Sequence, residues 1–272
     1  MFYARSYQKL LNYLDDLRSD KPLYQGFKLY LDRIIYNKDI NSKNPYYNFY
    51  YGNYENLESE FLSLDDDFHN LYLGHLFKDE FDKAENYYKK ADHLYQSKAY
   101  CALIYINKKD YQKAKYLLEA TEDFILSPYY LGYLYANGLG VDKNIDNAIF
   151  YYTKSASLGF QDASYLLATT YKNNLDQKFG NGYSDKIILD LVNKLHPQAI
   201  LNMLDATQGK KQLEILTKAI NSPDGDLKYQ IGLKYFYGNS LPCNKELSKY
   251  WLALAAQLNN RKAIKFLEEN FD

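Results

Sequence analysis

The chain has 272 residues and a mass of 32.0 kDa, and 47% of its residues are hydrophobic, which is enough for a continuous core in one or two domains or in one array of repeats. Its formal net charge is −1 and its sequence pI is near 6.4, so the composition does not favour binding to nucleic acid or to an anionic membrane. The 32 tyrosines join an apolar ring to a polar hydroxyl, which suits both half-buried helix faces and binding surfaces.

The first 66 residues are predicted to form a diverged helical cap. An amphipathic helix is expected over residues 1–20, a second helix over residues 23–36, and a polar loop after it. Aromatic residues crowd into positions 46–54, and we interpret this segment and the apolar residues behind it as a further helix pair, because terminal units of a helical stack cover an open core. Two interpretations of the aromatic segment stay open. Its rings either pack beneath the first repeat or form an exposed patch for a partner or a second copy of the chain.

Regular spacing begins near Asp67. A small residue recurs inside the first helix of each successive unit at intervals of roughly thirty residues, which is typical of a solenoid of helix pairs. The last interval is longer and contains a degenerate unit at about 198–224. These packing residues are Gly74, Ala102, Gly132, Ala168 and Gly232. Small residues in the second helices support the same register, at Ala84, Ala114, Ala148 and Ser248.

The segment 127–171 defines the repeat most clearly. Apolar residues recur there at helical spacing on both sides of a glycine-containing loop. Asn137, Gly138 and Gly140 are expected at positive φ, where the first helix stops and the chain turns back. Gly132 lies inside the first helix, where glycine costs up to about 1 kcal/mol relative to alanine. This glycine therefore predicts two antiparallel helices packed so closely that a β-carbon has no room.

This segment resembles the Sel1-like repeat (SLR), a branch of the tetratricopeptide repeat (TPR) superfamily. The matching residues are Leu131, Gly132, Tyr135, Asn137, Gly138, Gly140, Val141, Ala148, Tyr151, Ser155, Ala156, Gly159 and Ala163. The resemblance implies an all-α, right-handed α/α superhelix of about six or seven antiparallel helix pairs. Residues 67–126 resemble TPRs with short loops, and residues 127–272 resemble SLRs with longer loops, ending in a closing helix over residues 263–271.

In a TPR-like superhelix the first helices line a concave groove. The resemblance implies that positions three before, one after and four after each packing residue face this groove. We expect a protein or peptide to bind there through His75, Lys78, Tyr129, Tyr133, Tyr165, Thr169, Lys172, Tyr229 and Phe236. Leu71, Ala136 and Leu233 occupy the same register. The alternative is that many of these side chains only pack against neighbouring repeats.

The histidines and acidic residues do not indicate a metal site. His69, His75, His93 and His196 form no H-E-x-x-H motif, and the chain has no Cys and His spacing that suits zinc. The acidic run Asp65-Asp66-Asp67 is interpreted as the cap of a helix that begins near Phe68. We therefore expect no metal and no cofactor.

The glycine pairs do not indicate a nucleotide site either. Gly138-x-Gly140 and Gly180-x-Gly182 lack the preceding strand, the third glycine and the lysine of a phosphate-binding loop. We therefore predict a protein without enzymatic activity. The competing hypothesis is an enzyme with a diffuse site, for which the insert at residues 173–183 is the candidate location.

The function predicted from the resemblance is a protein-binding scaffold or adaptor of bacterial type. SLR proteins include immunity proteins that neutralise a toxin or secretion-system effector encoded beside them, and a chain made almost only of repeats suits this role. Signalling and virulence adaptors are the alternatives. The protein is expected to be a monomer or weak dimer, and self-association through the aromatic cap is a third hypothesis.

A cytoplasmic location is expected. The amino terminus does not have the pattern of a signal peptide, and no apolar run approaches the roughly 18 residues of a membrane span. Cys101 and Cys243 lie far apart in the sequence, which favours free thiols in a reducing compartment.

Overall fold

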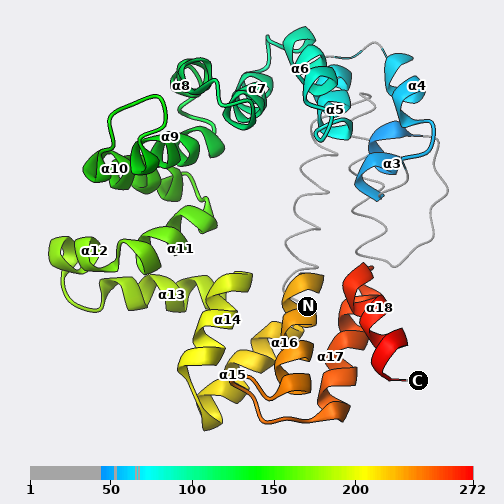
Figure 1. Cartoon of the computed structure of the whole chain (residues 1–272), viewed down its shortest axis with the longest axis vertical. Helices are drawn as coiled ribbons and strands as arrows, with labels where there is room; N and C mark the ends of the chain where they lie inside the picture. The colour runs from blue at the N-terminus through cyan, green and yellow to red at the C-terminus, as the bar shows by residue number, and fades with distance from the viewer. Residues whose placement is uncertain (1–43, 52–53, 65, 67, 272) are drawn as a thin grey trace, which may run out of the picture. The chain divides into compact units, whose positions relative to one another are not determined.

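The structure is a computed structural model that describes residues 44–51, 54–64, 66 and 68–271 (Figure 1). The helices predicted over residues 1–20 and 23–36 lie outside these residues. The chain divides into two compact units, Met1–Lys143 (unit 1) and Asn144–Asp272 (unit 2). All sixteen regular elements of the described residues are α-helices. The predicted all-α, solenoid-like fold of consecutive packed helices is confirmed.

In the described part of unit 1, successive helices pack against each other from α3 to α9. The helices are α3 (Pro45–Tyr51), α4 (Leu57–Leu62), α5 (His69–Leu76), α6 (Phe81–Lys90), α7 (Tyr95–Asn107), α8 (Tyr111–Glu119) and α9 (Leu126–Asn137). Short loops join α5 to α6 and α7 to α8, as the TPR-like spacing predicts. The helix pair predicted behind the polar loop is found as α3 and α4.

Unit 2 continues the same pattern with one extra helix. Its helices are α10 (Ile145–Ser157), α11 (Gln161–Thr170), α12 (Lys172–Phe179), α13 (Tyr183–Asn193), α14 (Pro197–Ala206), α15 (Gly209–Ile220), α16 (Gly225–Tyr237), α17 (Lys245–Gln257) and α18 (Arg261–Asn270). The insert at residues 173–183 forms most of α12, and α11 contacts both α12 and α13. The predicted closing helix is α18, which packs on α17.

The packing glycines act by letting a bulky side chain from the partner helix approach the backbone. A β-carbon on Gly74 would lie only 2.3 Å from a ring carbon of Tyr88. A β-carbon on Gly232 would lie 2.7 Å from Leu252 Cγ. Real β-carbons do not come this close to other atoms, so each helix pair requires its glycine. Gly132 is buried in α9, as the same register predicts.

The long loops end their helices at glycines with positive φ. Gly138 follows α9 at φ 67° and Gly238 follows α16 at φ 74°, and Gly140 also has φ 67°. The prediction for Asn137 is wrong. Asn137 is the last residue of α9, and its side-chain amide donates to the Tyr133 carbonyl at 2.8 Å. Because that hydrogen bond satisfies the amide within the helix, the turn begins one residue later.

The aromatic segment packs into the core at its start. Tyr46 and Tyr47 are 0% and 1% exposed, so the core-facing interpretation holds for these two rings. Tyr54 at the other end of the segment is 58% exposed. Asp66 accepts from the backbone N–H groups of Phe68 and His69 at 2.8 and 2.9 Å, which confirms the predicted cap at the start of α5 for this carboxylate.

Candidate functional site

A continuous row of aromatic rings runs through unit 1. We call Phe49, Tyr72, His75, Tyr100 and Phe124 the aromatic row. Their successive ring centroids lie 5.1, 5.9, 4.4 and 5.8 Å apart, and each contact is edge-to-face. Edge-to-face pairs at these separations add stabilisation beyond the apolar area that they bury. The row therefore links α3, α5, α7 and the turn before α9 through ring contacts.

The repeat register explains part of this row. Tyr72 and Tyr100 each lie two residues before a packing residue, Gly74 and Ala102. Tyr130 has the same position before Gly132. The groove prediction used three other register positions and therefore missed Tyr100. Tyrosine at one register position in three successive repeats was the signal that could have found it.

A cavity of about 620 Å³ opens beside the aromatic row. We call it the α5 pocket, and its lining residues are Phe49, Tyr54, His75, Leu76, Lys78, Asp79 and Tyr100. Two of the predicted groove residues, His75 and Lys78, therefore lie together in one pocket of unit 1. The repeat register does not reach Phe49 and Tyr54, but both lie in the aromatic segment 46–54, for which an exposed patch for a partner was one of the two interpretations.

A hydrogen bond to Tyr88 positions His75 in the pocket, and the preceding residue, Gly74, makes room for the Tyr88 ring. Gly74 lets the ring of Tyr88 approach α5, and the Tyr88 hydroxyl lies 2.9 Å from His75 Nδ1. Burial, with a smaller contribution from the charge of Lys78, lowers the pKa of His75 to about 4. The imidazole is therefore neutral at neutral pH. Burial also raises the pKa of the Tyr88 hydroxyl, which stays protonated.

The predicted groove residues of α9 have different exposures. Tyr129 is half-buried and meets Tyr130 edge-to-face, with ring centroids 5.3 Å apart. Tyr133, one helical turn further on, is 39% exposed. Of the two, only Tyr133 presents an exposed ring.

The predicted residues near α11 have partners inside unit 2. Tyr165 stacks on His196 with ring centroids 5.2 Å apart, and the Thr169 hydroxyl donates to the Tyr165 carbonyl at 2.8 Å. Lys172 forms an ion pair with Asp185 at 2.6 Å. The stacking joins α11 to the start of α14, the Thr169 bond lies within α11, and the ion pair joins α12 to α13. The role of these residues in binding stays a prediction.

The last two predicted residues lie beneath the closing helix. Tyr229 and Phe236 on α16 contact Phe266 of α18, with ring centroids 6.3 and 5.1 Å apart. Phe236 also contacts Phe271 at 5.7 Å. Both side chains therefore pack against a neighbouring helix, as the alternative to groove binding in the sequence analysis expects.

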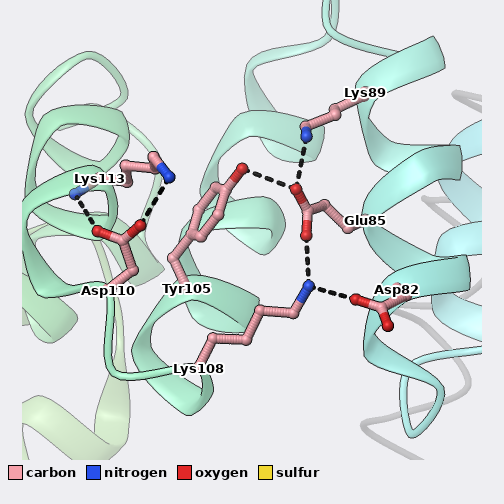
Figure 2. A network of polar contacts seen from close by, with 7 residues as sticks. All are labelled: Asp82, Glu85, Lys89, Tyr105, Lys108, Asp110 and Lys113. Carbon is pink, nitrogen blue, oxygen red and sulfur yellow. Dashed lines mark hydrogen bonds and ion pairs between the residues drawn. The ribbon is translucent and has the colours of Figure 1, made fainter.

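A polar network ties α6 to α7 on another part of unit 1 (Figure 2). Glu85 accepts hydrogen bonds from Lys89 at 2.5 Å, from Lys108 at 2.6 Å and from the Tyr105 hydroxyl at 2.7 Å, and Lys108 also reaches Asp82. Burial alone would raise the pKa of Glu85. The three donors outweigh burial and lower this pKa to about 2, so the carboxylate is charged throughout the physiological range.

A cavity of about 300 Å³ lies beside this network and is lined by residues of α6, α7 and α8. Cys101 lines it, and burial raises the pKa of its thiol to about 11. The thiol is protonated at neutral pH and is therefore a poor nucleophile. Cys101 and Cys243 are both free, as the sequence predicts.

The insert of unit 2 borders a third cavity, of about 600 Å³, between α10 and α12. Its walls include Ile149, Phe150 and Leu175, and Phe150 is 62% exposed. Among the described residues, no group of three or more His, Cys, Asp or Glu side chains is arranged to hold a metal ion. Across the same residues, no helix has the length and apolar character of a membrane span.

Helix pairs in repeat register, packing glycines and glycine-capped loops define an α-solenoid of the TPR-like class. The Sel1 repeat family model matches residues 71–91, 106–120, 129–160 and 228–260. The chain therefore carries Sel1 repeats in these four segments. Sel1 repeats form scaffolds that typically mediate protein–protein interaction.

Two solved structures resemble the chain. A Sel1 repeat protein from Oxalobacter formigenes is 19% identical with a TM-score of 0.50, and the match covers 98% of this chain and 86% of that one. A protective antigen with an SLR fold from uropathogenic Escherichia coli is 18% identical with a TM-score of 0.49, over 76% of this chain and 49% of that one. No curated protein matches the sequence. At these identities the likeness to the Oxalobacter protein concerns the fold alone.

Proposed function

We propose that this protein is a non-catalytic protein-binding module that contacts its partner at the α5 pocket. The observation that supports this most directly is the composition of that pocket. Rings from α3 and α7 and the exposed Tyr54 meet the imidazole of His75 and the amine of Lys78 in one cavity. Rigid aromatic side chains give a large contact area at a low cost in conformational entropy, and they dominate protein interfaces.

The finer role that we propose is that of an immunity protein, which binds and neutralises a toxin or effector encoded nearby. The repeats in both units and the free cysteines support a binding protein in a reducing compartment, the cytoplasm. A signalling or virulence adaptor is the alternative role. The two roles differ in their partner, because an immunity protein binds one protein tightly and abolishes its toxicity.

The test is an affinity capture from the native cell with the tagged full-length chain, followed by titration of the purified partner. Tyr54→Ala is the informative variant, because this exposed ring lines the α5 pocket. Tyr116→Ala is the matched control, since Tyr116 is an exposed tyrosine of α8 outside the pocket. We expect a one-to-one partner whose affinity falls about tenfold with Tyr54→Ala, a change of about 1.4 kcal/mol, and is unchanged with Tyr116→Ala.

Different results would redirect the proposal. Equal binding by both variants would remove the α5 pocket from the interface. A partner whose toxicity survives in the complex would exclude the immunity role and favour an adaptor. Failure to retain any protein would weaken the binding function, and the cavity between α10 and α12 would then be assayed for turnover.

A further inference from the structure

The two unpartnered polar groups of the α5 pocket define what kind of ligand it accepts. Lys78 follows α5, is exposed, and forms no ion pair within the described part of the chain. Its ammonium group is therefore available to a negatively charged ligand. Lys83, Lys89, Lys108 and Lys113 of unit 1 differ, because they pair with carboxylates, whereas Lys98 resembles Lys78 in having no ion pair among the described residues.

The second group is Nε2 of His75. Whether it carries a proton follows from the hydrogen bond between the other ring nitrogen, Nδ1, and the hydroxyl of Tyr88. Tyr88 is 4% exposed, and among the described residues its hydroxyl has one hydrogen-bond partner, His75 Nδ1. A buried hydroxyl proton without an acceptor is costly, so Tyr88 donates and Nδ1 accepts. The single proton of the neutral imidazole then lies on Nε2. His75 lines the α5 pocket, so Nε2–H is the donor that its ring offers to a ligand there.

The remaining walls of the pocket are mostly apolar. Phe49, Leu76 and Tyr100 surround the two donors with apolar surface, and Tyr54 adds an exposed ring. Asp79 is the one carboxylate among the lining residues, and it is exposed beside Lys78. A second negative charge on the ligand would be repelled by Asp79, so the site suits one acidic side chain better than a run of them.

We infer that the α5 pocket recognises a single aspartate or glutamate of a partner peptide, flanked by an aromatic or aliphatic side chain. The carboxylate accepts from His75 Nε2 and pairs with Lys78, and the flanking side chain packs on Phe49, Tyr54 and Tyr100. This inference rests on the proposed function and adds the chemistry of the partner segment. Charge complementarity fixes the specificity of such contacts and affects their association rate and salt dependence.

The experiment selects peptides from a random display library on the immobilised full-length chain. Three chains are compared: the wild type, Lys78→Glu and Lys98→Glu. Lys98 is the matched control, because it is also exposed and lines a different cavity of unit 1, the one beside Cys101. Both substitutions change an exposed side chain, so all three chains should keep the same melting temperature.

For the wild type and Lys98→Glu, we expect peptides that combine one acidic residue with a neighbouring apolar residue. For Lys78→Glu, we expect this preference to disappear and lysine or arginine to replace the acidic residue. A selected acidic peptide should bind Lys78→Glu at least about tenfold more weakly than the wild type by fluorescence anisotropy. Its affinity for the wild type should also fall as salt is added.

Three outcomes would overturn the inference: peptides without an acidic preference, the same preference with Lys78→Glu, or no enrichment over an uncoated surface. None of them would overturn the proposed function, which is judged by the captured partner and by Tyr54→Ala. If that partner binds Lys78→Glu as tightly as the wild type, the binding function stands and the acidic recognition fails.

Discussion

The helix pairs α5–α6 and α16–α17 use one packing rule for two purposes. Each has a glycine in its first helix and a bulky residue of the second helix against it, Tyr88 beside Gly74 and Leu252 beside Gly232. Leu252 belongs to an apolar cluster with Ala255 and Ala263. Tyr88 has a hydroxyl that reaches His75 and so positions a polar side chain in the α5 pocket. The register therefore determines the packing, and the residue chosen at one position determines whether the pair also builds a binding site.

The largest expected effect follows from filling the packing glycines. Gly74→Ala places a β-carbon against the buried Tyr88 ring, and Gly232→Ala places one against Leu252. Overpacking costs about 1 to 3 kcal/mol, partly offset by up to about 1 kcal/mol of helix propensity. We expect Gly74→Ala to lower the free energy of unfolding by about 2 kcal/mol and Gly232→Ala by about 1 kcal/mol, measured by urea denaturation.

The control for this prediction is the double variant Gly74→Ala with Tyr88→Leu. It reproduces the combination that α7–α8 has at the same register, Ala102 and Leu118. We expect it to recover part of the lost stability while losing the hydrogen bond to His75. Additive effects of the two substitutions would contradict the packing account, because residues in contact should be coupled.

The second effect concerns pH and the polar part of the α5–α6 pair. The folded protein keeps His75 neutral down to a pKa of about 4, whereas an unfolded histidine binds a proton below about 6.5. The unfolded state therefore binds more protons between these values, and stability falls as pH drops from 6.5 to 4. His75→Gln should remove this part of the decline, on the order of 2 kcal/mol, in unfolding curves measured across that range. Parallel curves for the two proteins would show that His75 does not titrate as described.

A third prediction compares two serines at one register position. Ser127 shares a hydrogen bond of 2.8 Å with Thr121, whereas the buried Ser97 hydroxyl has no partner in the described chain. The residue that corresponds to Thr121 in the earlier repeat is Ala91, which has no hydroxyl. Ser127→Ala should cost about 1 kcal/mol, and Ser97→Ala should be neutral or stabilising, as judged from melting temperatures. Equal losses would mean that the hydroxyl pair does not contribute.

The smallest effect concerns the loop of the α16–α17 pair, which α5–α6 does not have. Gln212 donates to the carbonyl of Ser240 at 2.9 Å, and Gln112 donates to that of Gly140 at 2.7 Å in unit 1. Ser240 has φ 65°, a conformation that favours glycine. We expect Ser240→Gly to change stability by about 0.5 kcal/mol or less, because relief of strain offsets the added chain entropy.

The reverse substitution in unit 1, Gly140→Ser, should be clearly destabilising, since its β-carbon would lie 2.6 Å from Tyr111 Cβ.

The fold was predictable because small residues recur at fixed register, and each helix pair needs them there. The extra helix α12 was not predictable, because its sequence is polar, has no repeat pattern and buries only Leu175. His75 and Lys78 were also placed by register. Phe49 and Tyr54 could not be placed by register, since they lie in the diverged cap, where the repeat does not apply.

The repeat register also does not predict which side chains of other elements cover a predicted groove residue. Tyr165 stacks on His196, and Phe236 contacts Phe266 of the closing helix. Both positions follow the groove rule, but their surroundings come from an N-cap histidine and a terminal helix that do not repeat. A rule taken from an ideal repeat places a residue on a helix and cannot show what covers it.

The most direct test of the account is hydrogen–deuterium exchange of the full-length chain, alone and with its captured partner. The proposed interface predicts slower exchange in residues 69–79 and 95–107 when the partner is bound, with the residues around Tyr54 also protected. The Lys78→Glu chain at the same partner concentration should show less of this protection. Protection confined to other helices, such as α10 and α12, would contradict a binding site at the α5 pocket.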